Sequence, residues 1–246
     1  MADRLSRRKL LLTFASVGAV VIGVGIGSLK VLDLRRVERE RFKVEGGRIK
    51  LPKPVKKRHL SVEEAIMRRR SGRDFTDSPL VSDDISQLCW AAQGVTDPAY
   101  GLRAAPSTGA LYPLELFLVV GNSDLQAGVY GYVPREHALE VVKIGDFRKQ
   151  LREASLDQAW IEDGALGLVI TAIYDRTTVK YGERGKLRYV PMEAGHVAEN
   201  IYLQAQSLGL GTASVGAFDD DRVRDVISAP SEYIPLHVMP IGHVRT

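Results

Sequence analysis

The chain contains 246 residues, of which 45% are hydrophobic and 26% are charged, so its composition is that of a globular protein and excludes a largely disordered one. Its net charge of +4 is divided unevenly, because residues 1–58 contain 16 Lys/Arg against 5 Asp/Glu, whereas residues 60–246 contain 18 against 25. The larger part of the chain therefore has a net charge of −7, which argues against nucleic acid as a partner.

The first predicted element is an uncharged stretch of twenty residues, 10–29, which is just long enough to span a bilayer. It is preceded by Arg7 and Arg8, a pattern that resembles a twin-arginine export signal. No Ala-x-Ala site closes the stretch, so we expect residues 1–30 to be an uncleaved anchor or an inefficiently cleaved signal. Basic flanks leave the orientation open, but the twin-arginine pattern favours a membrane-anchored or exported protein that faces the periplasm or the cell exterior.

Residues 31–59 form a predicted basic linker. They contain two prolines and a Gly-Gly pair but no sustained apolar period. From Lys30 to Arg58 the net charge is +8, which suits either a solvated spacer or a segment held against anionic lipid headgroups. We place the folded domain after this linker, at residues 60–246.

A helix is predicted to begin after Ser61, because Ser61 and Glu64 have the spacing of a capping box. The helix leads into a cluster of four arginines between residues 68 and 73, which also contains Ser71. Arginine forks match phosphate oxygens, and a serine hydroxyl adds a neutral donor. Because the cluster lies in an otherwise acidic domain and breaks at Gly72, we interpret it as an anion-binding site rather than a solvated face.

A second helix is predicted from Ser82 to Gly94. The stretch that follows, 104–120, organises the rest of the chain. Its first half contains small residues and two prolines, which keep the backbone open and leave N–H groups free to meet a ligand. Its second half, 114–120, is an apolar run typical of a buried central strand. The loop is therefore either the seat of a flat cofactor or a tight turn before a core strand.

The remainder of the chain mixes strands and helices. Predicted strands cover 129–133, 139–144, 165–174, 212–218 and 233–241, and predicted helices cover 146–154, 192–208 and 219–227. Because these elements do not alternate as regular βαβ units, the pattern favours an α+β fold.

Several other chemistries lack a motif. No Gly-x-Gly-x-x-Gly sequence follows a strand, so a nicotinamide donor such as NAD(P)H would dock only transiently. The five histidines show no metal-ligand spacing, and Glu193 with His196 forms one Glu-x-x-His unit where a di-iron bundle needs two. Cys89 is the only cysteine, which excludes an intrachain disulfide and a Cys-based metal site. No metal is predicted.

Four ordered motifs carry a family resemblance. They are Arg-Arg-Ser-Gly-Arg-Asp-Phe at 69–75, Pro-Ser-Thr-Gly-Ala-Leu-Tyr-Pro-Leu-Glu at 106–115, Lys-Tyr-Gly-Glu-Arg-Gly at 180–185 with Glu-Ala-Gly-His at 193–196, and Leu-Gly-Leu-Gly-Thr at 208–212. In this combination the domain resembles the FMN-dependent nitroreductase family, and within it the SagB/ThcOx-type dehydrogenase branch. The resemblance implies a nitroreductase-like fold with a central, mostly antiparallel sheet flanked by helices, and a homodimer with FMN at its interface.

The resemblance also implies cofactor-binding residues. Those matching the phosphate and ribityl contacts are Arg69, Ser71 and Arg73, with Arg70 and Arg245 as further candidates. Those matching the loop along the flavin ring are Pro106, Ser107, Thr108, Ala110 and Leu111, and those whose amides approach the N5 edge are Val215, Gly216 and Ala217. Many nitroreductases have an Asn where this chain has Ala110, and this difference places the chain with the dehydrogenase branch.

Lys180 and Tyr181 match a Lys-Tyr pair that the azoline-oxidising members use for substrate deprotonation. Oxidation of a C–H bond by a flavin requires hydride transfer to N5 and a base for the proton, and an amine or a phenolate can take that proton. The alternative is a surface lysine beside a packing tyrosine.

The expected function is that of an FMN-dependent oxidoreductase. It would either reduce nitro or quinone-type acceptors or dehydrogenate a small amine- or azoline-like substrate or a peptide azoline. Two alternatives stay open: a membrane-tethered flavin-binding or scaffolding protein without turnover, and a peptide-modifying subunit that is inactive until its partner is supplied.

Overall fold

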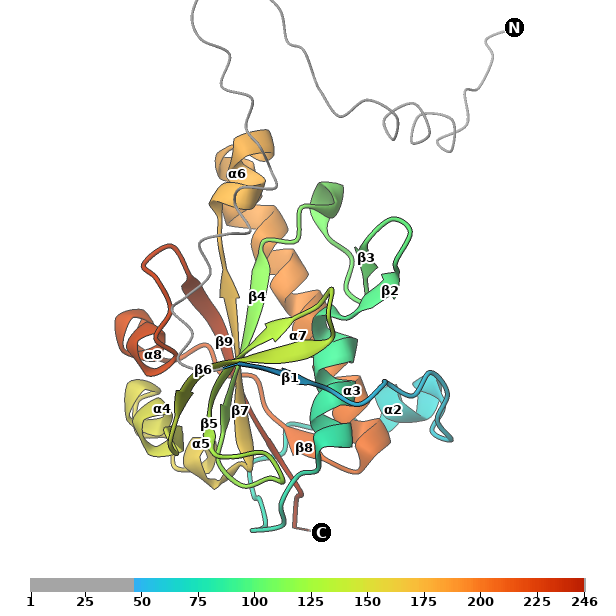
Figure 1. Cartoon of the computed structure of the whole chain (residues 1–246), viewed down its shortest axis with the longest axis vertical. Helices are drawn as coiled ribbons and strands as arrows, with labels where there is room; N and C mark the ends of the chain where they lie inside the picture. Colours follow the sequence, from blue (N-terminus) through green and yellow to red (C-terminus); the bar gives the residue numbers. More distant parts are fainter. Residues whose placement is uncertain (1–46, 246) are drawn as a thin grey trace, which may run out of the picture. The chain divides into compact units, whose positions relative to one another are not determined.

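The computed structural model describes residues 47–245 and is built around a seven-stranded sheet (Figure 1). The strand order is β1-β6-β5-β4-β7-β9-β8, and every neighbouring pair is antiparallel. The strands are β1 Arg48–Lys50, β4 Leu114–Val120, β5 Gly128–Val133, β6 Ala138–Ile144, β7 Leu166–Ala172, β8 Gly211–Thr212 and β9 Ile234–Gly242. A separate hairpin pairs β2 Val95–Asp97 with β3 Leu102–Arg103.

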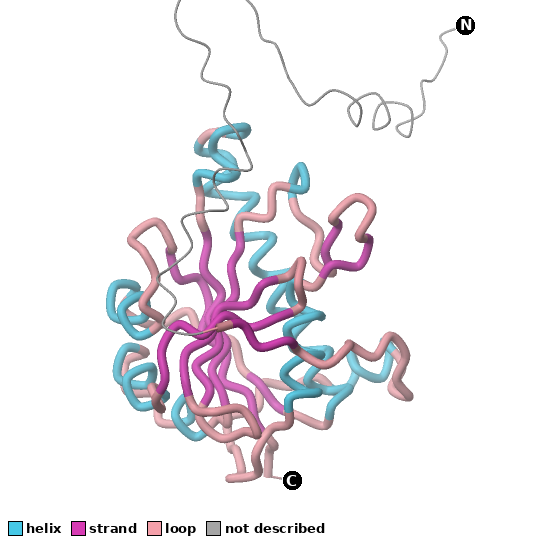
Figure 2. The backbone as a smooth tube through the Cα atoms, in the orientation of Figure 1, coloured by secondary structure: helices cyan, strands magenta, loops and turns pink. Residues whose placement is uncertain are grey.

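Helices cover both faces of this sheet (Figure 2). The α-helices are α2 Val62–Arg68, α3 Ser82–Gln93, α4 Arg148–Ala154, α5 Trp160–Asp163, α6 Asp175–Tyr181, α7 Val190–Leu208 and α8 Asp220–Val226. A 3-10 helix, η1, spans Thr108–Ala110, and a π-helix, η2, spans Gly185–Tyr189. The α+β architecture expected from the sequence, a central antiparallel sheet flanked by helices, is confirmed.

The core has two layers because side chains of a strand alternate between its faces. On β4, Leu116 and Leu118 pack in the layer that contains α3 and α7, whereas Phe117 and Val119 pack in the layer that contains α4 and α8. All seven residues of β4 are buried, as expected for a central strand with helices on both sides.

The sheet begins earlier than the boundary predicted at residue 60. Within the predicted linker 31–59, β1 pairs with β6, Leu51 is buried in the core, and the Val55 N–H donates to Gln87 Oε1 at 2.8 Å. The basic composition of this segment concealed its pairing, because Arg48 and Lys50 of the three-residue strand are exposed and only Ile49 between them is half-buried.

The predicted signal or anchor at residues 1–30 lies outside the described part of the chain. No helix within residues 47–245 is both long and apolar enough to cross a membrane.

Most predicted elements are present within a few residues of their expected bounds, but residues 212–218 do not form a continuous strand. Only β8, Gly211–Thr212, pairs with β9, and Val215 then forms an isolated bridge with Val238. Gly216 and Ala217 are exposed, so the chain leaves the sheet at the point where the resemblance places contacts with a flavin. The short elements β2, β3, η1, α5, α6 and η2 were not predicted, because they are too short to show a sustained apolar period.

Candidate active site

The arginine site, defined here as residues 69–73 with Arg245, lies where α2 ends and the chain runs beside β8. The guanidinium of Arg69 lies 5.2 Å from the ring centroid of Tyr202, and that of Arg73 lies 5.1 Å from the ring of Trp160. Arg70 donates to the main-chain oxygens of Met67 and Arg69. Within the described residues, no carboxylate is within ion-pair distance of these three arginines. Their charges are therefore available to an anionic group such as a phosphate.

Ser71 and Gly72 fix this segment against β8. The hydroxyl of Ser71 is 3.2 Å from the hydroxyl of Tyr202, and the Gly72 N–H donates to Thr212 O at 2.9 Å. A Cβ at Gly72 would lie 2.9 Å from Val244 Cγ1 and 3.3 Å from the Gly211 Cα. Only glycine allows the arginine site to approach the strand this closely.

Arg245 reaches the same site from the C-terminal end of the described chain. Its N–H donates to Asp74 O at 3.0 Å, and its Nε lies 3.0 Å from Asp74 Oδ1. The structure therefore brings Arg245 beside Arg73, as the resemblance implies, although Arg245 already has a carboxylate partner.

The stretch 214–217 also borders the arginine site. The Ser214 N–H donates to the same Tyr202 hydroxyl at 2.7 Å, and Gln158 Nε2 donates to Ala217 O at 3.1 Å. Val215 is buried and exchanges both backbone hydrogen bonds with Val238, whereas Gly216 has open space where a Cβ would be. The arrangement leaves exposed backbone next to the unpaired arginines.

The 106–112 loop forms the second part of the predicted site. It contains η1, and its backbone is left-handed at Gly109, Ala110 and Tyr112, with φ of 66°, 54° and 47°. Left-handed φ values at two non-glycine residues cost energy and persist only where surrounding contacts hold them. Pro106 is exposed, and Ser107, Thr108 and Leu111 are half-buried.

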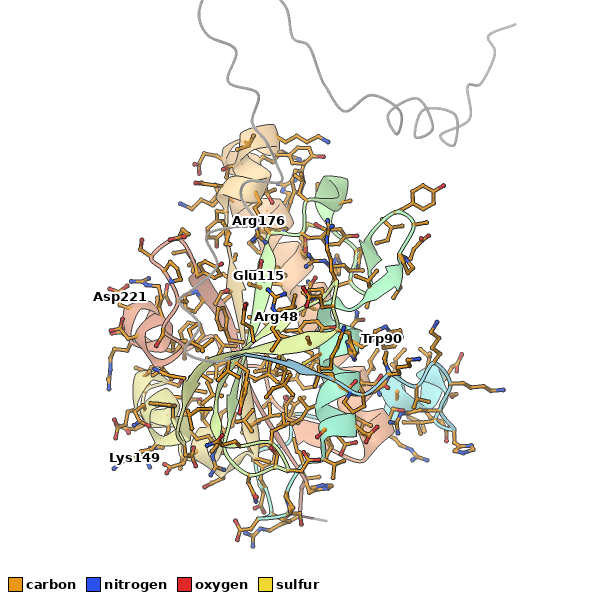
Figure 3. The ribbon with its side chains drawn as sticks, in the orientation of Figure 1. Arg48, Trp90, Glu115, Lys149, Arg176 and Asp221 are labelled. Atoms are coloured by element: carbon orange, nitrogen blue, oxygen red, sulfur yellow. The ribbon has the colours of Figure 1, made fainter. Side chains whose placement is uncertain are left out.

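Three polar contacts hold the loop at Tyr112. Its N–H donates to Ser107 Oγ at 2.9 Å, its hydroxyl accepts from the Arg103 N–H at 3.1 Å, and its carbonyl accepts from Arg176 Nη1 at 3.1 Å. Arg176 also pairs with Glu115 at 2.7 Å, and Figure 3 shows these two side chains meeting between α6 and β4. The loop is thereby fastened to both its own strand and α6.

Lys180 and Tyr181 meet the loop at Gly109. A Cβ at Gly109 would lie 2.8 Å from Tyr181 Oη and 3.3 Å from Lys180 Nζ. Lys180 is exposed and Tyr181 half-buried. The ring of Tyr181 packs edge-to-face on Tyr189, with centroids 5.2 Å apart. The structure thus unites the predicted catalytic pair with the predicted flavin loop, although about seventy residues of chain separate them.

Glu193 is a site residue that sequence reasoning missed. It is only 3% exposed, and within the described residues its Oε1 has no hydrogen-bond partner. Burial raises the pKa of Glu193 to about 7, against the effects of the Ser107 hydroxyl and the Arg103 charge. The available signal was an acidic residue on the apolar face of the helix predicted at 192–208.

His196 is exposed, so Glu193 and His196 do not converge on one site. No group of three or more metal-ligating side chains occurs in the part of the chain that the structure describes.

The two parts of the predicted site lie at different ends of α7. Glu193 lies beside the 106–112 loop, and Tyr202 lies at the arginine site. The two residues are nine positions apart on α7, which corresponds to about 14 Å along the helix axis. In Figure 1, η1 and α6 lie toward the upper end of α7, and β8 and the C-terminus toward the lower end. The two groups of predicted residues therefore contact α7 at points about two and a half turns apart.

Comparison with known proteins identifies the family. A family model described as the nitroreductase family matches residues 66–243, and the chain belongs to this family.

Three relatives show the range of similarity. A protein of Methanocaldococcus jannaschii that is named a nitroreductase is 44% identical over 184 residues, covering 74% of this chain and 91% of the relative. The crystal structure of a nitroreductase from Ralstonia eutropha JMP134 has a TM-score of 0.72 at 26% identity, covering 83% of this chain and 95% of that one. A chain of the Escherichia coli microcin synthetase McbBCD complex, solved with truncated pro-MccB17 bound, has a TM-score of 0.65 at 27% identity, covering 91% and 85%.

Proposed function

We propose that the protein is an FMN-dependent dehydrogenase that removes a hydride and a proton from an amine- or azoline-like group of a small molecule or a peptide. The observation that carries this proposal is that the side chains of Lys180 and Tyr181 both lie close to Gly109 in the loop. Family membership supports the oxidoreductase class, and the similarity to a chain of the microcin synthetase complex supports a peptide substrate.

The described residues fit FMN. The unpaired guanidinium groups of Arg69, Arg70 and Arg73, with the Ser71 hydroxyl, supply donors for a phosphate. The exposed residues Gly109 and Ala110 in the loop, and Gly216 and Ala217 after β8, suit a flat ring that needs main-chain donors. When bound, FMN supplies the acceptor for the hydride at its N5 atom.

Lys180 and Tyr181 have a separate task, which is to remove the substrate proton. In this proposal the Tyr181 hydroxyl or the Lys180 amine, once deprotonated, accepts the proton as the hydride leaves. The exposed position of Lys180 lets it exchange that proton with solvent afterwards.

We further propose a homodimer in which the arginine site of one chain faces the 106–112 loop of its partner. The separation of these parts along α7 supports this arrangement. So does the apolar surface of α2, where Val62, Ile66 and Met67 are 65%, 58% and 65% exposed beside a pocket of about 440 Å3 between α2, α3 and α7. Burial of this surface by a second copy would remove a cluster of large apolar side chains from water.

The test uses full-length protein reconstituted with FMN and a synthetic azoline-containing peptide, with oxidation followed by the mass loss of two hydrogens. The K180M and Y181F variants are expected to retain FMN and to lose about a hundredfold or more in turnover. K186M is the matched control, because Lys186 is also exposed and lies 5.6 Å from an aromatic ring centroid, that of Tyr174. Unchanged turnover in both K180M and Y181F would refute the catalytic assignment.

Reduction of nitro or quinone-type acceptors, with NAD(P)H as a transient donor, is the second candidate, favoured by the 44% identical relative named a nitroreductase. This reaction needs no base at Lys180. It is therefore distinguished by nitro reduction at equal rates in wild type, K180M and Y181F. A bound FMN that no donor or substrate reduces would instead indicate a flavin-binding or scaffolding protein without turnover.

A further inference from the structure

The side chain of Tyr202 joins the two segments that border the arginine site. Tyr202 lies on α7, half-buried, and packs against the core. Its hydroxyl oxygen is 3.2 Å from the Ser71 hydroxyl oxygen and accepts the Ser214 N–H at 2.7 Å. The guanidinium of Arg69 lies 5.2 Å from the centroid of its ring. One side chain therefore contacts two donors of the arginine site and the first residue of the stretch 214–217.

The local backbone explains why Arg69 and Ser71 both reach Tyr202. The backbone angles of Arg69, φ −52° and ψ 124°, are not helical, and Ser71 forms an isolated parallel bridge with Thr212, so the chain is extended here. Side chains two positions apart in an extended chain point to the same side. The Gly72 N–H, which donates to Thr212 O at 2.9 Å, fixes the segment in this position.

The hydrogen bonds of the Tyr202 hydroxyl determine the direction of its bond to Ser71. A phenol hydroxyl has one hydrogen to donate, and its oxygen also accepts. The backbone N–H of Ser214 can only donate, so it uses the acceptor side of the Tyr202 oxygen. Within residues 47–245, the one acceptor within hydrogen-bond distance of the Tyr202 hydroxyl is the Ser71 oxygen. The hydrogen of Tyr202 is therefore directed to Ser71, which leaves the hydrogen of Ser71 available to an anion.

We propose that Tyr202 is a positioning residue, which orients the Ser71 hydroxyl as a hydrogen-bond donor to the phosphate of FMN and so contributes to a preference for FMN over riboflavin. The inference rests on the proposed FMN function, because it concerns the phosphate assigned to the arginine site. Tyr202 acts through Ser71 and not on the phosphate itself. Without the Tyr202 hydroxyl, the Ser71 hydroxyl is free to rotate, and its orientation has to be fixed when the anion binds.

The experiment measures the dissociation constants of FMN and riboflavin by fluorescence titration of the full-length protein. Because riboflavin lacks the phosphate, the ratio of the two constants reports on the phosphate alone. The Y202F variant removes the hydroxyl and keeps the ring beside Arg69. We expect Y202F to weaken FMN binding about three- to tenfold more than riboflavin binding. The matched control is Y100F, which removes the hydroxyl of a side chain that is 70% exposed and is expected to keep the wild-type ratio. Equal weakening of both flavins in Y202F, or no change in either, would overturn the inference.

A double-mutant cycle with S71A tests whether Tyr202 acts through Ser71. S71A is expected to weaken FMN relative to riboflavin at least as much as Y202F does. Addition of Y202F to S71A is then expected to leave the ratio unchanged, because the group that Tyr202 orients is gone. Additive effects of the two substitutions on the ratio would overturn the inference. If Y202F folds poorly, S71A alone decides, since an unchanged ratio in S71A would refute Ser71 as a donor to the phosphate.

Failure of the proposed function has a different signature. If wild type binds neither flavin, the proposed FMN function is refuted. The role of Tyr202 is then decided by titration with inorganic phosphate, followed through the NMR chemical shift of the Gly72 amide. Y202F and S71A are expected to bind phosphate more weakly than wild type and Y100F. Equal affinities in all four proteins, or no phosphate binding by wild type, would overturn the inference.

Discussion

The burial of Glu193 affects the stability of the protein. Its folded pKa of about 7 is above the ordinary value of 4.5, so the neutral carboxyl is the form that the fold tolerates. The stability associated with this group is fully present below pH 4.5 and is lost as the pH rises through 7. A shift of this size corresponds to a cost on the order of 3 kcal/mol at pH 8. A buried carboxyl with a raised pKa weakens the fold when it is ionised, and such groups are common at functional sites.

The E193Q variant is therefore expected to be more stable than wild type at alkaline pH. We expect the free energy of unfolding of the FMN-free protein to rise by about 2–3 kcal/mol at pH 8 and to be unchanged near pH 4.5, because the neutral amide avoids burying a charge. Urea denaturation at the two pH values measures this difference. If E193Q changes the free energy of unfolding equally at pH 8 and pH 4.5, Glu193 does not titrate in the folded protein.

Residue identities in the arginine site and the 106–112 loop could be predicted, because their motifs lie within short continuous segments. The contact between Lys180 and Gly109 could not, since it depends on where the sheet places the end of α6. Glu193 was missed for a different reason. In the sequence it belongs to a single Glu-x-x-His unit, which was not interpreted as a metal site, and its burial on the apolar face of the helix was not recognised.

At the scale of the elements, the buried pair Glu115–Arg176 joins β4 to α6. Their side chains are 5% and 14% exposed, and Arg176 in addition donates to the carbonyl of Tyr112. This contact fixes α6, the helix that contains Lys180 and Tyr181, relative to β4, the strand that follows the loop. A buried pair of this kind is strongly destabilised by removal of one partner, but is often replaceable by two apolar residues.

We accordingly expect R176M to lower the free energy of unfolding by about 3–5 kcal/mol, because it removes the cation that lies 2.7 Å from the buried Glu115 carboxylate. The double variant E115M/R176M is expected to recover most of this loss. Urea unfolding of the three proteins at one pH measures both effects. If the double variant is no more stable than R176M, the loss of stability in R176M does not come from the Glu115 charge that Arg176 neutralises.

Elements with a clear pattern of apolar residues or a capping motif were predictable from the sequence. Elements that form only through pairing with residues far away in the chain were not. The apolar run at 114–120 coincides with β4, and the capping box at Ser61 begins α2 as expected. By contrast, β1 is a short basic strand whose only reason to be extended is its pairing with β6. The expected strand at 212–218 fails because the chain leaves the sheet after two residues of β8.

At the scale of the whole molecule, the predicted cofactor residues are divided between the two ends of α7. The homodimer stays a proposal that is based on the family resemblance, because no periodicity or composition of the sequence could reveal it. The export signal or membrane anchor predicted at residues 1–30, and the location it implies, stay predictions, because those residues lie outside the described range.

The central claim is that each FMN is bound between the arginine site of one chain and the 106–112 loop of the other. It is tested most directly by counting FMN in a heterodimer of two defective chains, R69A/R73A and G109V. Val at position 109 would clash with Tyr181 and strain a left-handed backbone. Each variant homodimer is expected to bind no FMN. The account predicts one FMN per heterodimer, because the intact arginine site of one chain meets the intact loop of the other. A heterodimer that binds none would contradict it.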